Sequence, residues 1–271
     1  MTQDSGQKNN IKKNKIDVDA THSDLHGIKG KLETILRKFR IATFAIALVP
    51  IYLLVMLIMA VAITPGVYFF YFLYDLSAGW WQPLHYLAIA FSIVAGFFIY
   101  GFSLIFLVPF VNFIVPIKMK PFRGPYYSLQ SVPWYVHNAL LYLVRYTFLE
   151  FITPTPFNIL FFRMMGMKIG KGVHLNTTNI SDAALITLED KVTIGGSAHI
   201  ICHYAAKGFL VVSRVTIKKG ATLGLKSTVM GDVEIGENAV IGPHEVVYPK
   251  SRIPEHYHSK EGKAVNGLSL D

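Results

Sequence analysis

Cysteine and charged residues are scarce in this chain. Cys202 is the only cysteine among 271 residues, so the sequence excludes an intrachain disulfide and a cysteine-rich zinc site. Charged residues make up 16% of the chain and hydrophobic residues 52%, and the mean hydropathy is +0.40. A soluble domain rarely combines these values. We therefore expect the apolar residues to be concentrated in segments that meet a membrane.

The signatures of several enzyme classes are also missing. The chain has no Gly-x-Ser-x-Gly nucleophile elbow, no Gly-x-x-x-x-Gly-Lys phosphate loop and no Gly-x-Gly-x-x-Gly dinucleotide motif. It also lacks the spacings typical of metal ligands. These absences argue against a serine hydrolase, a nucleotide-hydrolysing enzyme and a dinucleotide-dependent enzyme. We expect neither a metal nor a tightly bound cofactor.

Two runs without charge, residues 41–74 and 76–117, each exceed the roughly 20 residues that cross a hydrocarbon core. Cations gather before the first run and after the second, whereas residues 75–83 contain none. The positive-inside rule predicts a multi-pass protein of the inner (cytoplasmic) membrane with both termini in the cytoplasm. Contact with anionic membrane lipid accounts for the net charge of +9, so we expect no nucleic acid partner.

The composition changes along the chain and suggests five parts. Residues 134–152 form an amphipathic helix, and the charges of Arg145 and Glu150 favour an interfacial position over a third span. The expected parts are a disordered polar tail (1–28), a basic amphipathic helix with two transmembrane segments (29–117), an interfacial loop and amphipathic helix (118–165), a β-helix (166–254) and a C-terminal tail (255–271).

From Ile169 onward an aliphatic residue recurs at about every sixth position. The phase holds without a slip through Ile217, Leu223, Val229, Ile235, Ile241 and Val247. This period is typical of a solenoid in which each hexad supplies one short strand and one turn, and three hexads make a coil. The residue two places before the next aliphatic is expected to point inward and is small: Ala221, Ser227, Val233 and Ala239. The fold class predicted is transmembrane helices followed by a parallel β-helix.

The repeat breaks twice, at residues 177–184 and after Ile200. Loops that leave a rigid solenoid often carry the functional residues. The second break contains His203, which could act as a general base at its ordinary pKa. Asp182, in the first break, could orient or charge-stabilise that imidazole, or serve as a turn former. His199 is the alternative base, although its place at the end of a hexad suggests an outward side chain.

The sequence gives weaker support for functional roles of three lysines and one further histidine. Lys218, Lys219 and Lys226 could meet the phosphates of an acyl donor, or they could be solvated lysines on a strand face. His199, His203 and His244 could converge at a subunit edge as a metal site of the γ-carbonic-anhydrase kind, although their spacing fits poorly.

The hexads resemble those of the hexapeptide-repeat acyltransferase superfamily. Over residues 154–254 the order of features is most similar to the membrane-embedded C-terminal region of polylysine-synthetase-type nonribosomal peptide synthetases and to related free-standing acyltransferases. The residues that match are Thr155-Pro156-Phe157, the stretch 163–170 (Arg-Met-Met-Gly-Met-Lys-Ile-Gly), the stretch 176–182 (Asn-Thr-Thr-Asn-Ile-Ser-Asp), the stretch 192–195 (Val-Thr-Ile-Gly), His203 and residues 217–254.

The resemblance implies a left-handed coil, a homotrimer and direct transfer of an acyl group. It places the general base at His203 and an acidic residue at Asp182, and it disfavours Cys202 as a nucleophile. Residues 204–207 (Tyr-Ala-Ala-Lys) differ from the charged residues that the family tends to place there. No adenylation or carrier domain is recognisable, so we do not expect a complete peptide synthetase.

The sequence thus predicts a membrane-anchored acyltransferase. It would move an acyl or aminoacyl group from acyl-CoA or an acyl carrier protein to a hydroxyl or amine on the cytoplasmic face. The alternative is a catalytically inactive trimeric scaffold or transporter held together by the β-helix.

Overall fold

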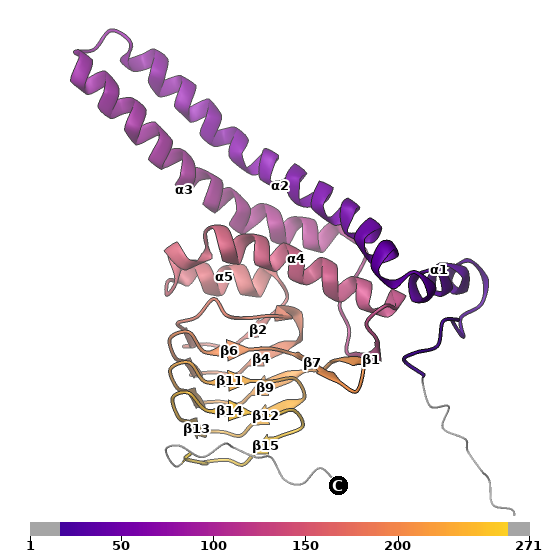
Figure 1. Cartoon of the computed structure of the whole chain (residues 1–271). Helices are drawn as coiled ribbons and strands as arrows, with labels where there is room; N and C mark the ends of the chain where they lie inside the picture. Colours follow the sequence, from indigo (N-terminus) through magenta and orange to yellow (C-terminus); the bar gives the residue numbers. More distant parts are fainter. Residues whose placement is uncertain (1–16, 260–271) are drawn as a thin grey trace, which may run out of the picture.

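A long helical hairpin comes first in the structure, which is a computed structural model that describes residues 17–259 (Figure 1). Helix α1 (Gly27–Lys38) leads into α2 (Arg40–Ser77), and α3 (Gln82–Ile114) returns beside it. Both α2 and α3 are long and apolar enough to cross a membrane. The expectations for residues 1–16 and 260–271 lie outside the described residues.

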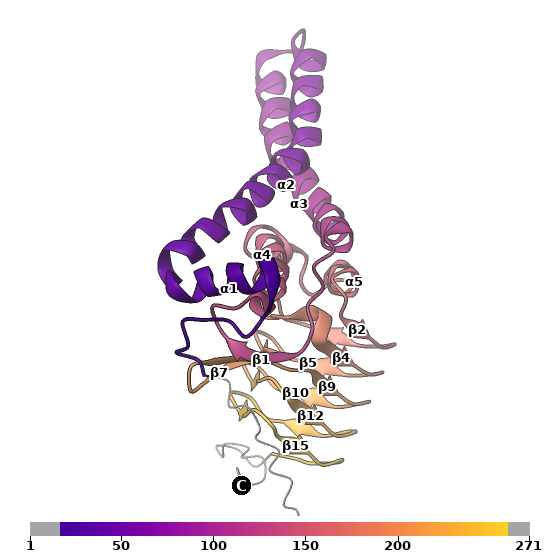
Figure 2. The same ribbon diagram turned by 90° about the vertical axis from the view of Figure 1, so that its right-hand side faces the viewer.

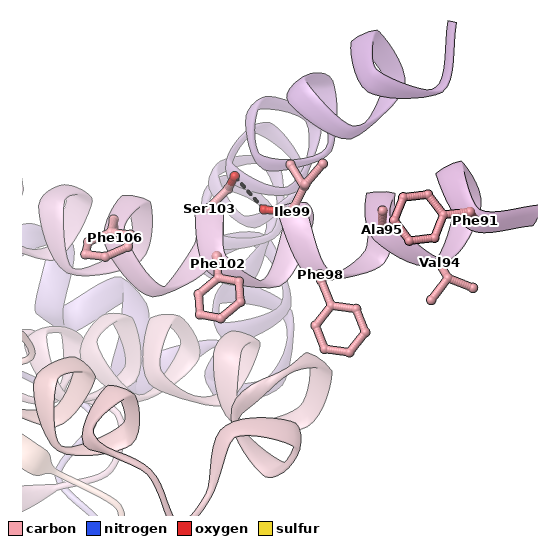
Figure 3. A pocket seen from close by; sticks show the side chains of 8 residues that line it. All are labelled: Phe91, Val94, Ala95, Phe98, Ile99, Phe102, Ser103 and Phe106. Carbon is pink, nitrogen blue, oxygen red and sulfur yellow. Dashed lines mark hydrogen bonds between the residues drawn. The ribbon is translucent and has the colours of Figure 1, made fainter. Parts of the chain in front are cut away.

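The two long helices approach closely at a pair of glycines. A β-carbon on Gly66 would lie 3.1 Å from the carbonyl oxygen of Gly96, so the absence of a side chain at Gly66 lets the helices approach closely there. Elsewhere α2 and α3 are poorly covered: only 11% and 28% of their most apolar windows are buried. One open apolar groove runs along α3 and is lined by phenylalanines, among them Phe91, Phe98 and Phe106 (Figure 3).

Between the helical hairpin and the coils, an interfacial loop and an amphipathic helix were expected, and the structure has a helix there together with further short elements. This part of the chain forms β1 (Phe122–Pro125), η1 (Leu129–Ser131), α4 (Val132–Thr147), η2 (Leu149–Ile152) and α5 (Pro156–Met164). The Thr155 hydroxyl caps α5 by accepting from Phe157 N at 3.3 Å, with Pro156 in the first turn. Helices α4 and α5 lie between the helical hairpin and the first coil (Figures 1 and 2).

The remaining chain stacks as a triangular coil whose faces are parallel sheets. One face contains β2 (Lys168–Ile169), β4 (Ile186–Leu188), β9 (Val215–Ile217), β12 (Val233–Ile235) and β15 (Arg252–Ile253). The second contains β3 (His174–Leu175), β5 (Thr193–Ile194), β10 (Thr222–Leu223) and β13 (Val240–Ile241), and the third β6 (His199–Ile200), β11 (Thr228–Val229) and β14 (Val246–Val247). The hexad phase predicted these positions, and the pairings confirm it.

The inward residues of the hexads form the core of the coil. Ile194, Leu223 and Ile241 stack in register on the second face and are buried. The small residues expected to point inward are also buried: Ala221, Ser227, Val233 and Ala239. Burial of these positions explains why the repeat tolerates only aliphatic and small side chains there.

Several corners contain glycine because neighbouring coils approach closely there. A β-carbon on Gly224 would lie 2.5 Å from the backbone nitrogen of Pro243 in the next coil. The left-handed backbone angle of this corner falls two residues later, at Lys226 (φ 53°), whereas Gly220 (φ 70°) makes the turn at the corner after β9. At Gly224 the glycine therefore serves close packing between coils, and Lys226 makes the turn.

The second break in the repeat, which the sequence indicated only as a loop that leaves the solenoid, is a β-hairpin. Strands β7 (His203–Ala206) and β8 (Phe209–Val212) pair antiparallel, and β8 also pairs with β1. Lys207 and Gly208 make the tight turn with φ of 50° and 79°, as hairpins require. The hairpin projects from one corner of the coil towards β1 and α1 (Figure 1).

Candidate active site

The structure brings together the two residues taken from the separate breaks of the repeat. Nδ1 of His203 lies 2.6 Å from Oδ2 of Asp182. The Asp182 side chain is fully buried, whereas the His203 side chain is 24% exposed. The imidazole is therefore fixed on its inner side by a carboxylate and remains accessible on its outer side.

Backbone geometry places Asp182 for this contact. Its φ of 61° and ψ of 38° are left-handed and make it the residue that precedes η3 (Ala183–Leu185). Aspartate tolerates this conformation better than most residues. The turn-forming and imidazole-orienting roles considered for Asp182 are therefore not alternatives, because the same residue does both.

Asp182 is held by α4 as well as by the coil. Asn138 donates from Nδ2 to Oδ1 of Asp182 at 2.7 Å and accepts the Asp182 backbone N–H at 3.0 Å. The Cys202 backbone N–H donates to Oδ2 at 3.0 Å. Each carboxylate oxygen thus accepts at least one hydrogen bond in a buried site, which suits an ionised acceptor.

These contacts fix the tautomer of His203. Because Asp182 Oδ2 can only accept, Nδ1 must carry the proton that it donates. Nε2 is then the nitrogen with the free lone pair and can take a proton from a substrate. The rings of Trp134 and His203 pack in a T-shaped arrangement, with centroids 4.9 Å apart, and this contact restricts rotation of the imidazole.

Side-chain hydrogen bonds hold the first break of the repeat (residues 177–184) against the helical segment that contains α4 and η2. Tyr142 Oη and Ser181 Oγ are 2.7 Å apart, and Arg145 hydrogen-bonds to Asn179. Glu150 accepts from the Thr178 hydroxyl. Arg145 and Glu150, the two charged residues that disfavour a third span, therefore contact the coil directly.

His199 lies on the neighbouring face, on β6, opposite Thr228. Its side chain is exposed, as expected for a residue at the end of a hexad. Partial burial, with a smaller contribution from the charge of Arg145, lowers its pKa below the ordinary value. His199 has no carboxylate partner among residues 17–259, so the geometry favours His203 over it as a base.

Cys202 is placed badly for a nucleophile. It is fully buried. Burial, followed by the nearby charge of Asp182, raises the pKa of its thiol well above the ordinary value. A protonated, enclosed thiol reacts poorly.

The candidate donor-binding lysines do not form one group. Lys218 and Lys219 lie at the corner that follows β9, and Lys226 lies at the corner that follows β10. Lys218 pairs with Glu234 at 2.7 Å. The His203 hairpin leaves a third corner, after β6. Within one chain the structure thus separates Lys226 from Lys218 and Lys219, and all three from His203.

No metal site is formed within the described part of a single chain. Among residues 17–259 no three His, Cys, Asp or Glu side chains are grouped to hold a metal ion. His244 lies at the corner between β13 and β14, a different corner from that of His203.

Two residues of this site were not predicted from the sequence. Asn138 and Trp134 lie on α4, four residues apart and thus on one face, and they contact Asp182 and His203 respectively. A buried asparagine on an otherwise apolar helical face was the available signal, since such a group needs partners.

No family model matches the chain. A curated relative is the delta-poly-L-ornithine synthetase of Acinetobacter baumannii (strain AB307-0294), 22% identical over 107 residues, which are 40% of this chain and 8% of that protein. The chain therefore covers less than two thirds of that relative's length.

Two acetyltransferases are among the solved structures that match this chain. The hexapeptide-repeat acetyltransferase VCA0836 of Vibrio cholerae O1 biovar eltor, complexed with acetyl coenzyme A, is 20% identical with a TM-score of 0.33 and matches over 38% of this chain and 61% of that one. The serine acetyltransferase of Neisseria gonorrhoeae is 13% identical with a TM-score of 0.36 and matches over 64% and 56%. The match to the delta-poly-L-ornithine synthetase confirms the resemblance drawn from the sequence, and the coil itself rests on the strand pairings above.

Proposed function

We propose that this chain is a membrane-anchored acyltransferase with His203 as its general base and Asp182 as the residue that orients it. The observation that carries the proposal is the 2.6 Å contact between His203 Nδ1 and the buried Asp182 carboxylate. The resemblance to hexapeptide-repeat acyltransferases supports the reaction type. The left-handed sense of the coil belongs to the same proposal.

The transfer needs one base and a thioester. Nε2 of His203 takes the proton of an acceptor hydroxyl or amine as its oxygen or nitrogen bonds to the thioester carbonyl carbon. Asp182 stabilises the imidazolium that forms. The carbon–sulfur bond then breaks, and the thiolate takes the proton from Nε2. The products are an ester or amide and a free thiol, and the histidine returns to its starting state.

The donor is acyl-CoA or an acyl carrier protein, and acyl-CoA acts as a co-substrate that leaves after each turnover. Since the lysines of one chain lie at two corners, neither of them the corner of His203, donor phosphates beside His203 would have to be met across a subunit boundary. This arrangement agrees with the homotrimer that the resemblance implies.

Helices α2 and α3 supply the membrane anchor. They are long and apolar, and their side chains are largely exposed, including Tyr68, Phe72 and Phe113. Exposed apolar surface of this extent indicates contact with lipid or with other helices. Helix α4 has 16 residues, about 24 Å, which is too short for a span, so it lies at the interface. The positive-inside rule places the coil in the cytoplasm, and a trimer would have about six spans.

The test is thioester consumption by the detergent-purified chain. Wild type would be compared with His203→Ala, using acetyl-CoA, longer acyl-CoAs and acylated carrier proteins with mixed amine and sugar acceptors. Loss of the base should lower the rate by about 10²–10⁴. His199→Ala should stay close to wild type, because His199 has no orienting carboxylate among the described residues.

His258→Ala serves as the matched control, since that histidine is exposed beyond the last coil. An unchanged rate in His203→Ala would remove His203 from its role. Failure of the wild type to bind or consume any of these thioesters would favour the inactive scaffold.

A further inference from the structure

A second cavity lies beside the start of α2, away from the coil. It has a volume of about 300 Å³ and is bounded by α1, β1 and the tip of the β7–β8 hairpin. Its charged and hydroxyl-bearing lining comes from separate parts of the chain: Asp19, Arg37, Arg40, Tyr126, Tyr127 and Lys207. A cavity of this size with converging polar groups is typical of a small-ligand site.

The lining is positively charged. Arg37 is largely buried and bound to Glu33 at 2.6 Å, and its Nε has no partner among the described residues. Arg40 lies 3.7 Å from Asp19, whose side chain is 86% exposed and therefore neutralises it weakly. Lys207 is exposed at the hairpin tip and forms no ion pair within residues 17–259. The three cations Arg37, Arg40 and Lys207 thus have only two carboxylates near them. These belong to Glu33 and to the solvent-exposed Asp19.

The cavity lies at the level where the apolar run begins. Arg40 is the first residue of α2, and residues 41–74 after it carry no charge. Within the proposed function α2 spans the membrane, so Arg40 lies at the depth of lipid headgroups. Tyrosine side chains such as those of Tyr126 and Tyr127 are common at the same depth.

Aromatic contacts connect the cavity wall to the candidate base. Phe44 of α2 packs against Tyr127 and Tyr135, with ring centroids 6.1 Å and 5.2 Å apart. Tyr135 contacts Trp134 at 4.7 Å, and Trp134 contacts His203 at 4.9 Å. His203 and Lys207 are four residues apart along the hairpin, about 13 Å at the rise of a β-strand.

We infer that this cavity binds the phosphate of an anionic membrane lipid and so holds a lipid headgroup at the tip of the hairpin whose base carries His203. The inference rests on the proposed function and states which class of molecule is held near the candidate active site. Arginine and lysine side chains are the usual ligands of phosphate. Inorganic phosphate and coenzyme A share this chemistry, but neither accounts for a site at the start of the apolar run.

Binding of dioctanoyl phosphatidic acid to the detergent-purified full chain tests the inference. The bound lipid would be counted by native mass spectrometry for the wild type and for Arg40→Gln combined with Lys207→Gln. The variant should bind about tenfold more weakly or worse, because two charge-assisted hydrogen bonds are lost. Both side chains are at least partly exposed, so the fold should survive, which a thermal unfolding curve checks.

Lys29→Gln combined with Lys31→Gln is the matched control. Both lysines are exposed on α1 outside the cavity lining, and the charge change is the same. The control should bind within about twofold of wild type, and an equal loss in both double variants would refute the cavity as the site.

Inorganic phosphate and coenzyme A, added separately, identify the source of the phosphate. If either displaces the lipid at a similar concentration, the assignment to a lipid is wrong. Because the measurement needs no turnover, it can be repeated in His203→Ala, where the lipid should still bind. A failed acyl transfer with intact lipid binding would thus reject the proposed function and leave this site standing.

Discussion

Replacing Asp182 by asparagine changes one carboxylate oxygen to an NH₂ group and keeps the side chain's shape. In the wild type, Oδ2 of Asp182 accepts from His203 Nδ1 and from the Cys202 backbone N–H, while Oδ1 accepts from Asn138 Nδ2. All of these partners are donors. The new amide must therefore turn its NH₂ group towards a donor whichever way it is oriented.

Both orientations of the amide have a cost that can be estimated. With the NH₂ group towards His203, the imidazole must move its proton to Nε2 and loses the lone pair that takes the substrate proton. With the NH₂ group towards Asn138, Asn138 cannot reverse without losing its bond from the Asp182 backbone N–H. A buried donor left unpaired costs about 1–3 kcal/mol. We expect stability to fall by that amount and kcat to fall by about 10²–10⁴.

Release of free thiol from the donor measures the rate, with kcat and KM determined separately. KM for the donor should change little, because Asp182 is fully buried and does not touch it. Asp232→Asn is the control, since Asp232 pairs at the surface with Arg252. In Asp182→Asn combined with His203→Ala the loss should not exceed that of His203→Ala alone, as for residues that act as a unit. A kcat within threefold of wild type for Asp182→Asn would refute the coupling.

Three other residues give independent tests. Burial, as the largest cause, lowers the pKa of His137 to about 4, whereas in the unfolded chain a histidine binds its proton near pH 6.5. Between pH 7.5 and pH 5 the wild type should therefore lose about 2 kcal/mol of unfolding free energy relative to His137→Gln, as measured by denaturant titration at each pH. Cys202 should resist maleimide in the folded protein and react after denaturation, because it is buried and the pKa of its thiol is raised; rapid labelling of the native protein would contradict this. Gly101→Ala should lower the thermal unfolding temperature by an amount equivalent to about 1–3 kcal/mol, because its β-carbon would lie 2.1 Å from the ring of Phe148. Gly96→Ala, whose β-carbon has 3.8 Å of clearance, should be tolerated.

The coil was predictable because its constraint is local and periodic. Each inward residue must be aliphatic or small whatever the rest of the chain does, so the period of six appears directly in the sequence. The pairing of Thr222 with Val240, three hexads later, follows from counting hexads. The two apolar helices were predictable for a similar reason, since composition alone fixes their length.

The hairpin and the support of the site were harder to predict. The Lys207-Gly208 turn between residues 203–206 and 209–212 is a hairpin signal, but in the sequence it appeared only as a gap in the repeat. Asn138 lies 44 positions from Asp182, and no local rule connects a helical asparagine with a distant turn. The spread of Lys218 and Lys226 over two corners followed from the hexad phase, yet their spacing in the sequence suggested one group.

The attachment of α4 to the first break has a consequence for how such proteins can be recombined. The coil carries His203, but the group that holds Asp182 in position belongs to the helix. A coil excised at residue 166, or grafted onto foreign helices, would keep its strands and lose the orientation of its base. Helix α4 and the coil must therefore be kept together for this chemistry. Natural recombination between such proteins should join segments before α4, where the long helices end.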